Sequence, residues 1–104
     1  PVTSPDPWLG LHVAVNRQHP ADHPDFNPEV FVPQERLTLD AALRAYTSGS
    51  AGINSRDGYT GAIKEGYAAD LVVVDRNPFD HPDHEIGMTR TVETFFAGES
   101  VYSA

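Results

Sequence analysis

The sequence predicts an α+β fold, and two segments carry that prediction. Residues 38–48 place apolar side chains three and four positions apart, as on one face of a helix; these are Leu39, Ala42, Leu43 and Tyr46. Residues 70–75 contain an unbroken apolar run in which β-branched valines favour a strand, Leu71-Val72-Val73-Val74. Further short β patterns flank that run, so helix and sheet share one chain.

The first predicted element is a short helix that starts at Pro7. Asp6 is a suitable N-cap, and proline is favoured at the first helical position. The apolar residues after Trp8 also alternate as in a strand, so the start signal decides for a helix. Residues 18–34 follow as a loop, because the four prolines there forbid a continuous helix or a central strand.

The helix over 38–48 has both of its ends marked. Thr38 is a good N-cap, and Asp40 lies in the first turn, where the helix dipole favours an acid. Gly49 is expected to end the helix in the left-handed conformation. Tyr46 lies on the apolar stripe and is expected in the core. A further helical turn is expected near residues 51–54.

The β elements are expected in the second half of the chain. Ala62-Ile63, the turn Lys64-Glu65-Gly66 and the strand 70–75 predict a hairpin. The long strand lacks polar alternation, which predicts burial on both faces. Residues 91–97 and 100–102 predict two more strands joined by Gly98-Glu99. Residues 77–84 are expected to form a proline-containing loop.

Composition excludes several classes of partner. The net charge is −8 and the isoelectric point is about 4.8. Nucleic acids and anionic membranes both require a basic surface, so neither is an expected partner. The chain has no cysteine, which excludes disulfides and thiolate metal sites. No apolar run approaches the ~20 residues that span a bilayer, and no signal peptide is visible. We expect a cytoplasmic protein.

Two groups of histidines and acids raise the question of a metal site. They lie in residues 19–25 (His19, Asp22, His23 and Asp25) and in residues 80–85 (Asp80, His81, Asp83, His84 and Glu85). Imidazole and carboxylate bind zinc, but metal sites need rigid elements that orient the ligands. Both groups lie between prolines, so we interpret them as solvated turns and assign no metal ligand.

Three other residues are open to a chemical or a structural interpretation. His12 lies between apolar neighbours and is more simply a packed or half-exposed residue than a base. Asp70 and Asp75 bracket the long strand, where carboxylates are more often structural than catalytic. No Gly-x-Ser-x-Gly nucleophile motif and no phosphate-binding glycine loop occur in the chain.

Four segments in this order resemble the C-terminal end of the amidohydrolase family 3 branch, which includes N-substituted formamide deformylases. They are residues 1–15, 35–47, 61–75 and 92–102. The segment Gly66-Tyr67-Ala68-Ala69-Asp70-Leu71-Val72-Val73 carries a signature that many amidohydrolase branches share. The agreement of helix, turn and strand signals over residues 37–75 is the most specific part of the resemblance.

The resemblance implies a fragment of a (β/α)₈ barrel enzyme that hydrolyses a non-peptide carbon–nitrogen bond. Residues 1–54 would hold the loop after the last barrel strand and the last barrel helix. Residues 55–104 would be strands of a small composite β-sandwich. The catalytic aspartate would lie just before Pro1 and the metal-binding histidines further upstream. The fragment would then hold no catalytic residue and no cofactor, whereas its parent would bind zinc or another divalent metal.

The same resemblance implies where substrate and partners would meet the chain. Thr3, Pro5 and Trp8 would lie at the mouth of the parent's site. The partner would be the missing N-terminal part of the enzyme, and without it the exposed strands would self-associate. The rival hypothesis is a free-standing β-rich binding module without catalysis. A small metal-binding protein that uses the histidine loops ranks last.

Overall fold

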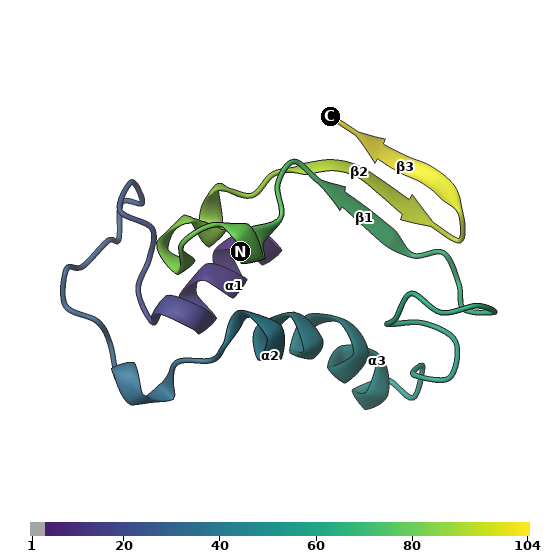
Figure 1. Cartoon of the computed structure of the whole chain (residues 1–104), viewed down its shortest axis with the longest axis horizontal. Coiled ribbons are helices and arrows are strands. Elements are labelled where there is room, and N and C mark those ends of the chain that lie inside the picture. The colour runs from purple at the N-terminus through teal and green to yellow at the C-terminus, as the bar shows by residue number, and fades with distance from the viewer. Residues whose placement is uncertain (1–3) are drawn as a thin grey trace. The chain divides into compact units, whose positions relative to one another are not determined.

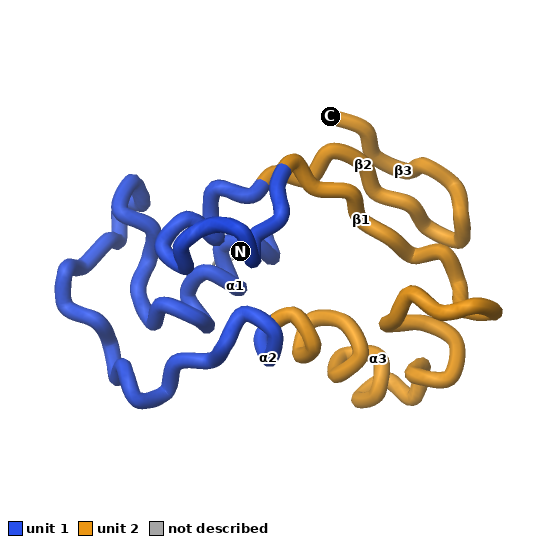
Figure 2. The backbone as a smooth tube through the Cα atoms, viewed as in Figure 1, with its two compact units in different colours: residues 1–42, 76–89 blue, residues 43–75, 90–104 orange. Residues whose placement is uncertain are grey.

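The computed structural model describes residues 4–104. Its contacts divide the chain into two compact units, residues 1–42 with 76–89 (unit 1) and residues 43–75 with 90–104 (unit 2). Figure 2 colours the two units along the backbone. The predicted division at residues 54 and 55 concerns the expected architecture of a larger enzyme, and it stays a prediction.

Unit 1 opens with helix α1, Pro7–Asn16. Asp6 accepts a hydrogen bond from the Trp8 N–H at 3.0 Å, and Pro7 occupies the first helical position. The helix ends at Arg17, which takes a left-handed φ of 55° and donates its N–H to the Val13 carbonyl. The start signal in the sequence therefore predicted this helix correctly.

A long connection follows α1 and contains one short 3₁₀ turn, η1 (Pro33–Glu35). The predicted loop over 18–34 is confirmed up to that turn. Its backbone is held locally, for example by the His23 N–H donating to the Pro20 carbonyl at 2.9 Å. Gln18 donates its side-chain amide to the Asn27 carbonyl at 2.7 Å. These bonds replace the regular pairing that proline denies to the segment.

Two 3₁₀ helices complete unit 1, η3 (Pro78–Asp80) and η4 (Asp83–Met88). The sequence predicted only a loop here, because 3₁₀ segments this short leave no apolar period to detect. Helix η4 packs on α1. The core of the unit gathers from distant parts of the chain and consists of Trp8, Leu11, Val15, Leu39, Ala42 and Ile86.

A continuous helical run occupies residues 39–53 as α2 (Leu39–Arg44), the π-helical turn η2 (Ala45–Gly49) and α3 (Ser50–Ile53), as Figure 1 shows. Thr38 caps it as predicted, since its hydroxyl accepts from the Ala41 N–H at 3.1 Å. The predicted stop at Gly49 is wrong: this glycine has a right-handed φ of −65° and the run continues. The core placement of Tyr46 is also wrong, because the π turn breaks the 3.6-residue period and leaves Tyr46 49% exposed.

Unit 2 contains an antiparallel sheet in the order β1 (Leu71–Val74), β2 (Thr91–Phe96) and β3 (Glu99–Ser103) (Figure 1). In its register Val73 lies opposite Glu93, and Thr94 lies opposite Tyr102. The predicted strand 70–75 and the predicted hairpin after residue 91 are confirmed. The turn residues are Ala97 and Gly98, one position earlier than predicted, with φ values of 51° and 82°. A two-residue hairpin turn with both φ values positive matches the twist of the strands.

Two β predictions are wrong. Residues 62–63 form no strand, and Ile63 is 89% exposed. The turn at Gly66 does form, with φ 86° and a bond from the Tyr67 N–H to the Lys64 carbonyl, but no strand precedes it. Strand β1 is not buried on both faces either, because Val72 and Val73 are 54% and 46% exposed. Among the described residues, β2 is the one strand that pairs with β1, and it leaves these two valines about half exposed.

Candidate functional site

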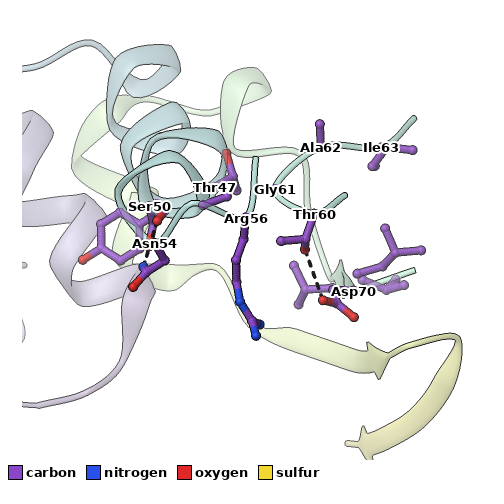
Figure 3. Close-up of a pocket in the computed structure, with 14 residues that line it drawn as sticks. Thr47, Ser50, Asn54, Arg56, Thr60, Gly61, Ala62, Ile63 and Asp70 are labelled. Carbon is purple, nitrogen blue, oxygen red and sulfur yellow. Dashed lines mark hydrogen bonds between the residues drawn. The ribbon is translucent and has the colours of Figure 1, made fainter. Parts of the chain in front are cut away.

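The clearest concavity among the described residues lies within unit 2. It has a volume of about 880 Å³ and lies between the helical run, the segment 54–63 and the start of β1. Figure 3 shows its polar rim with Thr47, Ser50, Asn54, Arg56 and Thr60. Its apolar lining includes Ile63 and the β1 residues Leu71, Val72 and Val73. Sequence reasoning missed this pocket, because no local pattern records how the segment 54–63 returns to the helix.

Gly61 brings the pocket's loop onto the helix. Its φ is 90°, a conformation that residues with a side chain rarely adopt. A Cβ atom at this position would lie 2.6 Å from the Ala51 Cβ and 3.1 Å from the Thr47 carbonyl oxygen. Glycine is therefore required twice over, for the backbone angle and for the close approach. A glycine just before the apolar pair Ala62-Ile63 was the available sequence signal.

Asp70 forms a second anchor at the rim of the pocket. Its carboxylate accepts from the Thr60 hydroxyl at 3.2 Å and from the Ala97 N–H at 2.9 Å (Figure 3 draws the first bond). Asp75, at the other end of β1, accepts from the Arg90 N–H at 2.9 Å. The two acids therefore fasten both ends of β1 to the flanks of β2, which confirms the structural interpretation of this pair.

The pocket's side chains do not form a catalytic group. Its lining contains no histidine, cysteine, lysine or glutamate. Asp70 is its only carboxylate and is already engaged by two donors. Acid–base catalysis requires a titratable group aimed at the reacting atom.

The predicted histidine and acid group of residues 19–25 comes together in part. Ligand atoms of His19, His23 and Asp25 all lie within 4.8 Å of one another, while Asp22 is not part of this group. The two imidazole rings stack with their centroids 4.4 Å apart and their planes 18° from parallel. His23 Nδ1 accepts a hydrogen bond from the Asp25 N–H at 3.0 Å.

This arrangement does not fit a metal ion. A histidine lone pair lies in the plane of its ring, so two stacked, nearly parallel rings do not aim at one point. The bond to Asp25 N–H also occupies one nitrogen of His23. These three residues therefore do not provide the ligand set of a zinc centre. In the second group, Glu85 lies 3.5 Å from Arg76 and 3.8 Å from His84 and acts as an ion-pair partner.

His12 is the buried histidine of unit 1, with 2% of its surface exposed. Its Nδ1 accepts from the Gly87 N–H at 3.1 Å. Burial lowers the pKa of His12, nearby His19 and His84 lower the pKa further, and Asp22 opposes them. Of the two structural alternatives for His12, packed or half-exposed, the structure shows the packed one.

The three residues predicted at the mouth of the parent's site differ in burial and in whether the structure describes them. Thr3 lies outside the described residues. Pro5 is exposed just before α1, and Trp8 is buried in the core of unit 1. A role for them in substrate contact stays a prediction. Among the described residues, no helix is long and apolar enough to cross a membrane.

Comparison with known proteins finds one matching family model and several similar proteins. Residues 1–102 match the model of the amidohydrolase family. The chain is 34% identical over 104 residues to "Putative amidohydrolase YtcJ" of Bacillus subtilis. This alignment covers 98% of the chain and 19% of that protein. It is 36% identical over 66 residues to N-substituted formamide deformylase of Arthrobacter pascens, covering 64% of the chain and 12% of that protein.

A plant protein is similar as well. The chain is 27% identical over 103 residues to LONG AFTER FAR-RED 3 of Arabidopsis thaliana, covering 98% of the chain and 16% of that protein. The chain thus spans less than a fifth of the length of each of these relatives. No solved structure matches it.

Proposed function

The chain belongs to the amidohydrolase family, and from this membership we propose that it is the C-terminal portion of a metal-dependent hydrolase. The enzyme would act on a non-peptide carbon–nitrogen bond of the amide or formamide kind. The match over residues 1–102 carries the proposal. The relative named N-substituted formamide deformylase supports the choice of bond.

The exposed apolar side chains of unit 2 support the proposal that the chain is one portion of a larger enzyme. Val72, Val73 and Val101 are apolar strand residues that are 54%, 46% and 61% exposed. Apolar strand faces are normally covered by a second layer. We propose that the rest of the enzyme supplies this layer and packs into the pocket beside β1.

The elements then take positions in a larger architecture. The helical run over residues 39–53 would be the last helix of a (β/α)₈ barrel. Strands β1 to β3 would belong to a composite β-sandwich, so that residues 1–54 and 55–104 fall in different domains of the parent. Thr3 and Pro5 would lie near the mouth of the barrel, where loops after the strands form the active site.

The catalytic chemistry would reside outside this chain. Amidohydrolases are generally metal-dependent, and a bound divalent metal such as zinc supplies an activated water at neutral pH. The residues 19–25 do not fit that role, because their imidazole rings are stacked and one nitrogen is engaged. The part played by residues 1–104 is structural: it closes the barrel and supports the second domain.

The test compares this chain with the protein encoded by the complete reading frame. Both are treated with zinc and assayed for formate release from an N-substituted formamide and for amine release from simple amides. The proposal expects chelator-sensitive turnover by the complete protein and none by the isolated chain.

Two results would overturn the proposal. One is turnover by the isolated chain at the rate of the complete protein. The other is a reading frame that lacks an aspartate just before Pro1 and a His-x-His motif far upstream, which would favour the binding-module hypothesis.

A further inference from the structure

Unit 1 contains a buried histidine whose hydrogen bond depends on its protonation state. His12 lies on α1 and accepts the Gly87 N–H of η4 at Nδ1, over 3.1 Å. A backbone N–H can only donate, so Nδ1 must carry a lone pair and the neutral ring holds its proton at Nε2. Protonation at Nδ1 would place two donors face to face and abolish the bond.

The surroundings make this contact close and part-buried. A Cβ atom on Gly87 would lie 3.2 Å from His12 Nδ1 and 3.0 Å from the Pro20 side chain. Ile86, which precedes Gly87, and Thr89, two positions after it, are each 1% exposed, whereas Met88 between Gly87 and Thr89 is 50% exposed. The bond is part-buried, and a buried donor that loses its partner destabilises the fold more than an exposed one.

A second bond joins the same two elements without titrating. The Asn16 side-chain amide donates to the Asp83 carbonyl at 2.8 Å and to the His12 carbonyl at 2.9 Å. Helix η4 is thus joined to α1 both by a bond that depends on pH and by a bond that does not. The Leu37 N–H donates to the Ala14 carbonyl, which ties the returning chain to α1 separately.

We infer that His12 is an acid-sensitive latch, which holds η4 on α1 while its ring is neutral and releases η4 when the ring is protonated. This inference concerns unit 1 alone and does not depend on the proposed enzymatic function.

The charged groups around His12 differ in whether they favour or disfavour protonation of its ring. Helix α1 carries no titratable side chain besides His12. From the loop, His19 disfavours a positive ring and Asp22 favours one. Helix η4 carries Asp83, His84 and Glu85, of which His84 disfavours protonation of His12. Glu85 already lies near Arg76, His81 and His84.

The direction of the pH effect follows from burial. The closed latch binds a proton less readily than an exposed histidine, whose pKa is 6.5. Above that pH both states are neutral and the latch is fully effective. As the pH falls below about 6.5, the open state gains protons that the closed state does not, so opening becomes easier.

The test is amide exchange of the whole chain by nuclear magnetic resonance. The protection factor of the Gly87 amide, corrected for intrinsic exchange, is measured from about pH 8 to about pH 5. We expect it to fall at least about threefold, with long-range imidazole spectra showing the Nε2–H form of His12 at high pH.

Two variants separate the latch from general acid loosening. His12→Asn places its Oδ1 as many bonds from the backbone as Nδ1, so it should keep protection at high pH and lose the pH dependence. His23→Gln, in the loop stacked on His19, should leave the dependence unchanged. If His12→Asn does not fold, His84→Gln replaces it and should move the midpoint of the fall to higher pH.

Three results would overturn the inference. They are constant Gly87 protection over that pH range, an Nδ1–H form of His12 at high pH, and an undiminished pH dependence in His12→Asn.

Discussion

The two units of this chain differ in how far they bury their own apolar side chains. Unit 1 buries Trp8, Leu11, Val15 and Ile86 at 8% exposure or less. Unit 2, all of which is described, buries only Ala51 to that degree while Ile63, Phe96 and Val101 are more than half exposed. Unit 1 has a core of its own, whereas unit 2 leaves most of its large apolar side chains exposed to solvent.

Local signals and burial of apolar area contribute differently to the two units. Local signals, such as the Asp6 cap and the Ala97-Gly98 turn, form the elements of both units. Burial of apolar area supplies most of the stability of a domain, and unit 2 gains little of it alone. The family match over a fifth or less of its relatives' length fits this contrast.

The largest expected effect is a cavity in the core of unit 1. Ile86→Ala removes a side chain that is 1% exposed, which should lower the free energy of unfolding by about 2–5 kcal/mol. Urea denaturation followed by the fluorescence of Trp8, the chain's one tryptophan, measures it. Ile63→Ala, at a residue that is 89% exposed, is the matched control and should stay within about 0.5 kcal/mol. Equal losses in the two variants would erase the contrast between the units.

A smaller effect is expected from Gly61→Ala, in unit 2. The new methyl group would meet the Ala51 Cβ at 2.6 Å in a backbone with φ 90°. The strain should cost about 1–3 kcal/mol, and amide resonances of residues 60–63 and of α3 should shift while Trp8 fluorescence keeps its midpoint. Gly58→Ala is the control, because a Cβ there meets nothing within 4 Å. An unperturbed α3 would contradict the docking of this loop.

Removing the carboxylate of Asp70 should have a still smaller effect. Asp70→Ala deletes two hydrogen bonds that are exposed to solvent, from Thr60 and Ala97. We expect a loss of about 1 kcal/mol and faster exchange of the Ala97 amide. Asp57→Ala serves as the control, since Tyr67 bonds to the backbone of Asp57 and not to its side chain. If the Ala97 amide exchanges equally fast in the unmodified chain and in Asp70→Ala, Asp70 does not fasten β1.

The smallest effect on stability is expected from polar replacements on the exposed sheet. Val72→Thr with Val73→Thr changes residues that are already about half exposed, so stability should move by less than about 0.5 kcal/mol. The state of association should change more. The unmodified chain should exceed its monomer mass of 11.4 kDa in light scattering at high concentration, and the double variant should approach it. A clean monomer for the unmodified chain would refute self-association through the strands.

Sequence reasoning reached the elements whose signals are local. The cap at Asp6, the cap at Thr38 and the valine-rich strand were all found this way. It failed where tertiary contacts decide: Gly49 stayed within the helix, and Tyr46 left the core once the π turn changed the period. The pocket around Gly61 and the contact between His12 and Gly87 join residues that no spacing rule connects.

The most direct test of the account measures how well the strands of unit 2 are covered. Amide exchange of β1, β2 and β3 is compared between this chain and the complete protein. We expect the protection of Val72, Val73 and Val101 to rise at least about tenfold in the complete protein, while that of Leu11 and Val15 in α1 changes much less. Equal protection of the three strand residues in both proteins would contradict it.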